Sequence, residues 1–256
     1  MIPHKIHYCW FSKESFPALV NTCIQSWKRF MPEYEFILWD YDKARQIQMP
    51  WINKALEENR WAFAADAVRL YAVYSEGGIY LDSDVEALRS FDPLTNQPYF
   101  FGYENGSHRI EAATFGAEAH FPAVEKALQF YQTHFFEYKE SDVDFLVIPN
   151  ILAETFQNMQ LEIFSEDYFS PKNFTNGQIC ISPNTFSIHH FSSSWRPSVL
   201  QKSIRCRQWI YKHFPQKIAK ILHAPLSILT NFYNLGWRKT LQKIVRRFNV
   251  SKDSAE

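Results

Sequence analysis

Two aspartates with a single serine between them follow a short apolar stretch, in the segment GGIYLDSDVEAL at residues 77–88. Asp82, Asp84 and Glu86 occupy every second position there. Neighbouring carboxylates repel each other unless a cation or a shared proton lies between them, and carboxylate oxygens are the ligands that Mg²⁺ and Mn²⁺ prefer. A turn with solvated acids is the alternative, but the position directly after GGIYL favours a metal site.

A buried helix carrying one charged pair is predicted just before the aspartates. Residues 61–74 are apolar almost throughout, and a helix that is apolar on all sides is a buried one. Asp66 and Arg69 are the exceptions, three residues apart and therefore on one face. They form either a structural ion pair or a polar contact surface, in which Asp66 accepts hydrogen bonds from sugar hydroxyls and Arg69 donates to a hydroxyl or a phosphate.

The elements that must position these residues alternate in type along the chain. Strands are predicted at 5–11, 34–40, 79–81, 99–104, 112–117 and within 184–195, and helices at 16–32, 53–78 and 122–138. Such alternation predicts an α/β fold with a mainly parallel sheet flanked by helices. Ligands of these sheets bind beyond the carboxyl ends of the strands, where Asp82 and Asp84 lie.

The composition is that of a globular protein in a reducing compartment. A chain of 256 residues allows one sizeable domain with an appendage. Its four cysteines form no C-x-x-C pair, which argues against a disulfide framework and a zinc site. The N-terminus has no signal-peptide core, and no apolar run approaches the ~20 residues that span a bilayer. We therefore expect a cytoplasmic protein.

Charge is divided unevenly along the chain. Residues 1–200 carry 15 Lys and Arg against 25 Asp and Glu, whereas residues 201–256 carry 12 against 2. In WRKTLQKIVRRF, at 237–248, apolar residues at helical spacing alternate with five cations. A basic amphipathic helix is typical of binding to an anionic membrane surface, and a helix packed on the acidic body is the alternative. The acidic body disfavours a nucleic-acid role.

Three parts are predicted from these patterns: a catalytic body at 1–196, a basic amphipathic helical region at 197–250 and a disordered tail at 251–256. Pro215, Pro225 and Gly236 are expected to divide the basic region into two or three helices.

Four segments together resemble glycosyltransferase family 32, the sugar transferases with a DXD motif. They are IPHKIHYCWF, CIQSWKRFMPEYEFILWD, AFAADAVRLYAVYSEGGIYLDSDVEAL and IHHFSSSW, in the family's order over roughly residues 1–195. The family includes bacterial capsule and lipopolysaccharide sugar transferases and eukaryotic Golgi relatives. The resemblance implies a GT-A fold, a Rossmann-like sheet with a nucleotide-sugar site, and sugar transfer that retains the anomeric configuration with Mn²⁺ or Mg²⁺.

The resemblance also implies which residues bind the donor. Trp10 is similar to the aromatic residue that stacks on the nucleobase, and the backbone of Cys9 would reach the edge of the base. Asp66 and Arg69 match the contacts to the donor sugar. Asp82 resembles the aspartate that touches ribose, sugar and metal.

Further positions match the metal site and the loop over the donor phosphates. Asp84 resembles the direct metal ligand. His190 occupies the position of a third metal ligand, with His189 as its rival. Ser193 and Trp195 resemble the loop that closes over the phosphates.

We therefore expect a metal-dependent retaining glycosyltransferase. It would move galactose or another hexose from a nucleotide sugar, expected to be a UDP-sugar, to a polyprenyl-linked or other glycan acceptor in surface (capsular) polysaccharide synthesis, at the inner face of the cell membrane. No clear nucleophile stands out; Glu104 and Glu111 are candidates, and same-face attack assisted by the leaving phosphate is favoured. A metal-dependent phosphohydrolase or nucleotidyltransferase and a non-catalytic sugar-nucleotide or membrane-binding protein stay open as alternatives.

Overall fold

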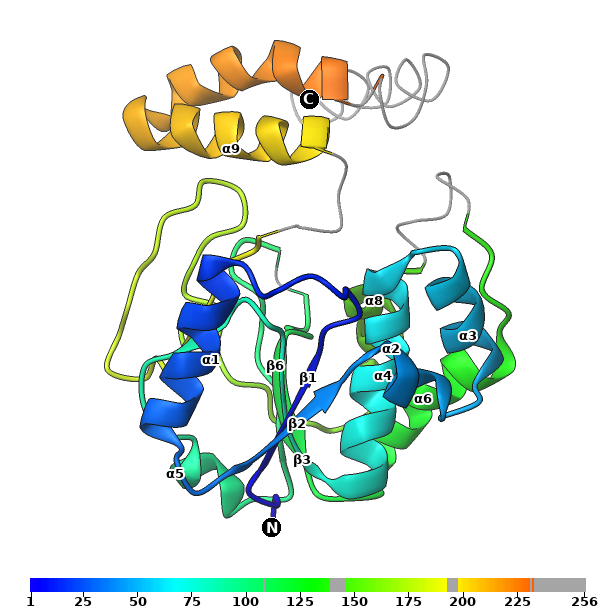
Figure 1. The fold of residues 1–256 in the computed structure, drawn as a ribbon. Helices are drawn as coiled ribbons and strands as arrows, with labels where there is room; N and C mark the ends of the chain where they lie inside the picture. The colour runs from blue at the N-terminus through cyan, green and yellow to red at the C-terminus, as the bar shows by residue number, and fades with distance from the viewer. Residues whose placement is uncertain (108, 139–145, 193–197, 231, 233–256) are drawn as a thin grey trace. The chain divides into compact units, whose positions relative to one another are not determined.

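A five-stranded mixed sheet lies at the centre of the N-terminal part of the chain (Figure 1). Its strands are β1 (Lys5–Cys9), β2 (Glu35–Trp39), β3 (Gly78–Leu81), β5 (Tyr99–Phe100) and β6 (Thr114–Ala117), in the order β2-β1-β3-β6-β5. β1 pairs in parallel with β2 and β3, and β6 pairs antiparallel with β3 and β5. The predicted α/β class is confirmed, but the sheet is mixed rather than mainly parallel. The reversed strand is β6, which is antiparallel to both of its neighbours; among the described residues between β5 and β6 there is no helix that could form the crossover that a parallel strand needs.

The computed structural model describes residues 1–107, 109–138, 146–192, 198–230 and 232. By its contacts the chain divides into a first unit (Met1–Glu137, Asp144–Phe174 and Gln178–Trp195) and a second unit (Tyr138–Val143, Thr175–Gly177 and Arg196–Glu256). The boundary predicted between residues 196 and 197, and the tail predicted at 251–256, lie outside the described residues.

Helices cover both faces of the sheet in the first unit (Figure 1). They are α1 (Ala18–Phe30), α2 (Tyr41–Arg45), α3 (Pro50–Glu57), α4 (Trp61–Glu76), α6 (Pro122–Thr133) and α8 (Ile148–Phe156). Helix α1 lies on one face, and α4 and α6 lie on the other. The helix predicted at 16–32 is confirmed as α1, which buries one stripe, with Val20, Ile24 and Trp27 in the same core cluster as Ile79 and Leu81 of β3.

The single helix predicted over 53–78 is wrong, because α3 ends at Glu57 and α4 begins at Trp61. The chain turns at Asn59, whose φ of 55° is left-handed. Asparagine tolerates this conformation because its short side chain can bond to nearby backbone. The Asn59 N–H donates to the Leu56 carbonyl at 3.0 Å, and the Arg60 N–H donates to the Ala55 carbonyl at 2.8 Å. These bonds close the last turn of α3.

Two glycines connect α4 to β3. Gly77 (φ 65°) ends the helix and Gly78 (φ 110°) begins the strand, in backbone regions that other residues rarely adopt. A Cβ on Gly78 would meet the Lys5 carbonyl oxygen at 2.9 Å. The Gly-Gly pair therefore allows β3 to approach β1 closely, and this places Asp82 at the end of the strand.

A second, two-stranded sheet joins distant segments of the first unit. β4 (Val85–Ala87) pairs antiparallel with β7 (Ser187–His189), with Val85 opposite His189. The indole N–H of Trp27 in α1 donates to the Val85 carbonyl at 2.7 Å, which fixes β4 on the core. The end of β7 is therefore held beside Asp84.

The described part of the second unit contains two antiparallel helices. They are α9 (Ser198–His213) and a helix at 216–230. The hydroxyls of Ser203 and Thr230 lie 2.7 Å apart, and the rings of Tyr211 and His223 are 6.0 Å apart, so the two helices run side by side as a hairpin. We call residues 198–230 the basic hairpin.

The prolines in the basic hairpin act differently. The predicted break at Pro215 is confirmed, because α9 ends at His213 and the next helix begins at residue 216. The break predicted at Pro225 is wrong: this residue is exposed within the helix, where it removes one N–H donor and the helix continues. Gly236 lies outside the described residues. In the described part of the chain, no helix has both the length and the hydropathy needed to cross a membrane.

Candidate functional site

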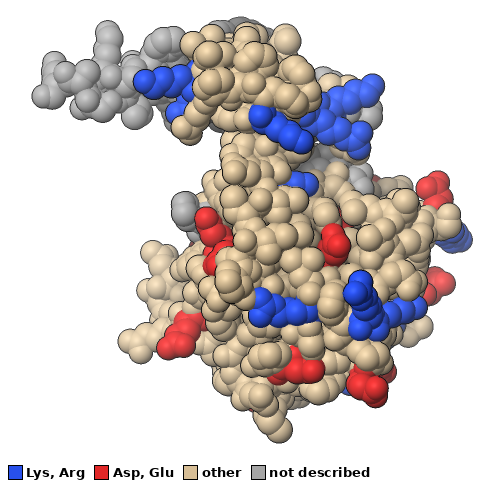
Figure 2. Space-filling model, turned by 90° about the vertical axis from the view of Figure 1, so that its left-hand side faces the viewer, with Lys and Arg blue, Asp and Glu red and all other residues tan. Residues whose placement is uncertain are grey.

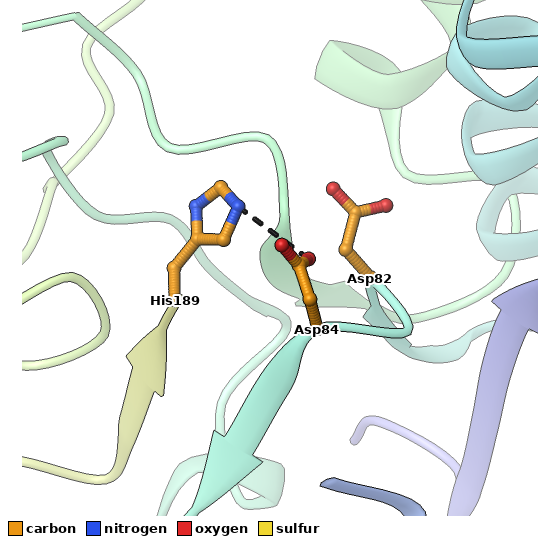
Figure 3. A group of neighbouring side chains, drawn as sticks. All are labelled: Asp82, Asp84 and His189. Atoms are coloured by element: carbon orange, nitrogen blue, oxygen red, sulfur yellow. Dashed lines mark ion pairs between the residues drawn. The ribbon is translucent and has the colours of Figure 1, made fainter. Parts of the chain in front are cut away.

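The two aspartates of the DxD segment lie on a tight turn between β3 and β4. The N–H of Val85 donates to the Asp82 carbonyl at 2.9 Å, and the Asp82 N–H donates to the Ala113 carbonyl at 2.8 Å. This turn directs both carboxylates to the same side (Figure 3). Asp84 is buried and Asp82 is partly exposed, as expected for a pair that faces a ligand at the edge of the sheet.

His189 completes a group of three potential metal ligands. Its Nε2 atom lies 3.6 Å from Oδ1 of Asp84 (Figure 3). One ligand atom from each of Asp82, Asp84 and His189 lies within 4.8 Å of the other two. The three side chains come from the end of β3, the start of β4 and the end of β7, so the pairing of β4 with β7 assembles the group.

His190, the predicted third ligand, faces elsewhere. Successive strand residues point to opposite faces, and the Nε2 atom of His190 lies 2.9 Å from Oε2 of Glu86. Its backbone N–H donates to the Asp84 carbonyl at 3.0 Å, which keeps it next to the turn. The structure therefore brings His189, and not His190, to the two aspartates.

Arg69 connects helix α4 to the DxD turn. Its Nη2 atom lies 2.9 Å from Asp66 and 3.3 Å from Asp82, and its Nη1 atom donates to the Ala112 carbonyl at 2.8 Å. The guanidinium also lies 4.7 Å from the ring centre of Tyr80, whose hydroxyl donates to Asp82 at 2.8 Å. Asp66 and Arg69 are thus an ion pair, as in one predicted alternative, and Arg69 also contacts Asp82 of the DxD turn.

The carboxyl groups of the site differ in their affinity for a proton. Burial raises the pKa of Asp66 to about 7, although the charge of Arg69 opposes the shift. Burial also raises the pKa of Asp82, again against Arg69. For Asp84 the effect of burial is outweighed by His189 and by the backbone N–H of Ser192 at 2.7 Å, so its pKa is lowered. Asp84 is therefore the most firmly ionised carboxylate of the three.

Glu111 holds the opposite side of the His189 ring. Its Oε2 atom lies 3.3 Å from Nδ1 of His189, and its Oε1 atom accepts from the Ala113 N–H at 2.7 Å. Burial disfavours the imidazolium, but Glu111 and Asp84 outweigh it and raise the pKa of His189 to about 9. Without metal the ring is protonated at neutral pH, so binding of a cation to Nε2 must release a proton.

Glu104 and Glu111, the candidate nucleophiles, are both engaged. One oxygen of Glu104 accepts from the hydroxyl of Ser107 and from Arg109 at 3.4 Å. Both oxygens of Glu111 are in the contacts given above. The contact of Glu111 with His189 was not apparent from the sequence, because 78 residues separate the two and no local pattern connects them.

The predicted base-binding residues lie at the same edge of the sheet as Asp82. In the parallel pair of β1 and β3, Ile6 is opposite Ile79, so the end of β1 at Cys9 lies level with the end of β3. Trp10 follows β1 and is half-buried, with its ring edge-on to that of Phe16 at 5.3 Å. Ser193 and Trp195 lie outside the described residues.

The ligand set fits a hard or borderline divalent cation. Two carboxylates and one imidazole supply oxygen and nitrogen atoms that suit Mg²⁺ or Mn²⁺. Two ligands with bonds of about 2.1 Å to one ion lie at most about 4.2 Å apart. The ligand atoms of Asp82, Asp84 and His189 lie within 4.8 Å of one another, so these side chains need to move only slightly closer together to bind one ion.

Part of the N-terminal half of the chain matches the sequence model of a known family. Residues 17–101 match the sequence model described as the glycosyltransferase sugar-binding region containing a DXD motif. The matched region includes Asp66, Arg69 and both aspartates of the DxD turn. The resemblance to DXD-motif glycosyltransferases is confirmed for this region.

Curated relatives match part of the chain. Inositol phosphoceramide mannosyltransferase 3 of Schizosaccharomyces pombe is 33% identical over 104 residues, which cover 38% of this chain and 28% of the relative. Mannosyl phosphorylinositol ceramide synthase SUR1 of Saccharomyces cerevisiae is 30% identical over 104 residues, covering 39% and 27%. The chain thus spans between a quarter and a third of the length of these relatives. Among solved structures, the PaToxG glycosyltransferase is 20% identical, with a TM-score of 0.49 and coverage of 62% of this chain and 69% of that one.

Proposed function

We propose that the protein is a metal-dependent, retaining glycosyltransferase that moves a hexose from a nucleotide sugar to a glycan acceptor. One observation carries this proposal: within and beside a matched DXD region, the chain brings Asp82, Asp84 and His189 together at the carboxyl end of the central sheet. A phosphohydrolase or nucleotidyltransferase could use similar carboxylates, but the matched region is a sugar-binding one.

Each residue of the site has a defined task in this proposal. Asp82, Asp84 and His189 hold Mn²⁺ or Mg²⁺, which when bound neutralises charge on the departing diphosphate. Arg69 fixes the Asp82 carboxylate through its 3.3 Å contact. Asp66 accepts a hydrogen bond from a sugar hydroxyl, and Trp10 stacks on the nucleobase beside the backbone of Cys9.

Retention is proposed to occur through same-face attack. A double displacement needs a carboxylate nucleophile behind the anomeric carbon. Glu104 and Glu111, the candidates from the sequence, are engaged by Arg109 and by His189. The leaving phosphate then takes the proton of the attacking hydroxyl, and a transition state of oxocarbenium character develops at the sugar.

A lipid-linked acceptor is supported by the relatives. The name of one yeast protein specifies transfer of mannose to an inositol phosphoceramide. The name of the other specifies a mannosylated phosphorylinositol ceramide as the product, and both of these ceramides are lipids. We extend this to a polyprenyl-linked or other lipid-linked glycan used in surface polysaccharide synthesis. We therefore consider mannose as well as galactose as the transferred hexose, and GDP as well as UDP as the nucleotide of the donor.

Attachment to the inner face of an anionic membrane is proposed through the basic hairpin. Residues 198–230 contain six Lys and Arg and no Asp or Glu, and the helices at the top of Figure 2 show basic and no acidic side chains. The helix at 216–230 exposes Ile218, Ile221, Leu222 and Leu229, with Ile221 at 72% and Leu229 at 67%. These positions share one helix face, and an exposed apolar face beside cations is typical of helices that lie in a membrane interface.

A donor-hydrolysis assay tests the proposed reaction. The purified protein is incubated with UDP- and GDP-linked galactose, glucose, N-acetylhexosamines and mannose, with Mn²⁺ or with EDTA. We expect slow release of UDP or GDP from one donor, abolished by EDTA and by Asp84→Asn. Release of inorganic phosphate or of a sugar phosphate would instead indicate the phosphohydrolase or nucleotidyltransferase class.

A further inference from the structure

A buried carboxylate lies behind the histidine of the candidate metal centre. Glu111 is 2% exposed and precedes β6, whereas His189 ends β7. Glu111 thus comes from the segment that leads into the main sheet, and His189 comes from the small sheet. We propose that Glu111 is a positioning residue: it holds the His189 ring in the tautomer and orientation that present Nε2 to the metal. This inference rests on the proposed function, because it concerns the same metal site.

The contacts of Glu111 leave its carboxylate little freedom. Oε1 accepts the Ala113 N–H at 2.7 Å, directly before β6, and Oε2 lies 3.3 Å from Nδ1 of His189. A carboxylate without a proton accepts hydrogen bonds and donates none. The proton of a neutral His189 therefore lies on Nδ1, where Glu111 accepts it.

The other ring nitrogen is consequently free to bind metal. With the proton on Nδ1, the lone pair of Nε2 faces the Oδ1 atom of Asp84 at 3.6 Å. Metal-bound histidines usually donate their second N–H to a carboxylate or carbonyl, and loss of that partner typically costs 10- to 100-fold in metal affinity. Glu111 is placed for this task, and the engagement of both its oxygens argues against a role as nucleophile.

His190 and Glu86 provide a matched control pair in the same sheet. Their contact, from Nε2 to Oε2 at 2.9 Å, is shorter than that of His189 with Glu111. His190 does not reach the aspartates, however. The change Glu86→Gln removes one carboxylate charge near the site, as Glu111→Gln does, but it leaves the metal-facing histidine untouched.

The test is a double-mutant cycle on Mn²⁺ affinity, measured by electron paramagnetic resonance of the free ion without donor. We expect Glu111→Gln to weaken binding 10- to 100-fold and Glu86→Gln to change it less than about threefold. In a His189→Ala background, Glu111→Gln should have no further effect, because the residue acts through the ring. Glu111→Asp, which keeps the charge and shortens the side chain, should also weaken binding, and thermal unfolding without metal checks that each variant folds.

Two results would overturn the inference. Unchanged Mn²⁺ affinity in Glu111→Gln, with affinity weakened in His189→Ala, would leave the metal site intact and remove Glu111 from it. An equal loss from Glu111→Gln with and without His189 would show that the carboxylate acts through its charge or through the fold. Absence of Mn²⁺ binding in the unaltered protein would instead contradict the proposed metal site itself.

Discussion

At the scale of single residues, the site depends on charges that are buried together. Arg69 lies between two carboxylates, Asp66 and Asp82, and is itself buried. His189 lies between Asp84 and Glu111 in the same manner. Removing one partner from a buried ion pair leaves an uncompensated charge in the interior. The free-energy cost of that charge exceeds the net stabilisation that the intact pair provides. Stability and metal binding are therefore coupled at these positions.

Replacement of Arg69 should destabilise the fold. The change Arg69→Met leaves two carboxylates without their cation, and we expect the free energy of unfolding to fall by about 3–5 kcal/mol, as measured by urea denaturation. Arg29→Met, at an exposed position on α1, is the control and should change it by less than about 1 kcal/mol. Equal effects of the two changes would contradict the role given to Arg69.

The stability of the metal-free protein should fall as the pH rises from about 6.5 to 8.5. The pKa of His189 is raised from 6.5 to about 9 in the folded state. The stabilisation that protonated His189 contributes is fully present below its pKa in the unfolded state and is lost as the pH rises through its pKa in the folded state. The free energy of unfolding then falls by at most about 1.4 kcal/mol per pH unit. Urea unfolding in EDTA, compared between the natural protein and His189→Asn, isolates this slope. A difference that does not vary with pH would contradict the proposed charge on His189.

The aspartate pair could be predicted because its sequence signal is local, whereas its partners His189 and Glu111 could not be assigned from the sequence. Asp82 and Asp84 stand out in a short segment after an apolar strand. The choice between His189 and His190 depends on the face of β7 that meets β4, with Val85 opposite His189, and this pairing has no signal in the local sequence. Glu111 was noticed only as a carboxylate near a strand end for the same reason.

At the scale of elements, two connections determine where the side chains lie. The turn at Asn59 separates α3 from α4, and the Gly77-Gly78 pair leads α4 into β3. The glycine pair was apparent from the sequence, because glycine is the usual helix stop. The turn at Asn59 was missed, because Glu58, Asn59 and Arg60 include neither glycine nor proline and the apolar pattern continues through α4.

Substitutions at Asn59 distinguish the two arrangements. In the structure this residue is left-handed, so Asn59→Gly should be neutral or slightly stabilising and Asn59→Ala should cost about 1 kcal/mol. In one continuous helix the order would be reversed, since glycine is about 1 kcal/mol worse than alanine in a helix interior. The free energy of unfolding of the two variants is the measurement, and greater stability of the alanine variant would contradict the turn.

At the scale of the whole molecule, the charge asymmetry of the chain corresponds to its division into units. The acidic excess of residues 1–200 falls mainly in the first unit, and the cations of the basic hairpin fall in the second. Residues 198–230 are helical, as predicted for the basic region. The basic helix predicted at 237–248 lies outside the described residues, so the membrane proposal is argued from the basic hairpin.

Variants of the basic hairpin should lose affinity for anionic vesicles. The change of Lys217 and Lys220 to Gln should weaken binding about 30-fold, since each cation contributes roughly 1 kcal/mol. The change of Ile221 and Leu229 to Ser should weaken it at least tenfold by removing apolar burial. Co-sedimentation with phosphatidylcholine vesicles, with and without phosphatidylglycerol, is the measurement.

The change of Lys28 and Lys126 to Gln provides the matched control, because both lysines are exposed in the first unit. This variant loses the same charge and should bind vesicles as the natural protein does. Equal binding to neutral and anionic vesicles would contradict the proposal. Self-association detected by light scattering, and lost when Ile221 and Leu229 are changed to Ser, would instead indicate that the apolar face binds a second copy of this chain.

The most direct test of the central claim is the binding of UDP and GDP as a function of Mn²⁺, measured by calorimetry in the natural protein, His189→Ala and His190→Ala. We expect one nucleotide to bind only with Mn²⁺, His189→Ala to abolish this dependence and His190→Ala to retain it, because His189, unlike His190, reaches Asp82 and Asp84. Nucleotide binding that does not depend on Mn²⁺, or that is lost in His190→Ala and kept in His189→Ala, would contradict the proposed metal site.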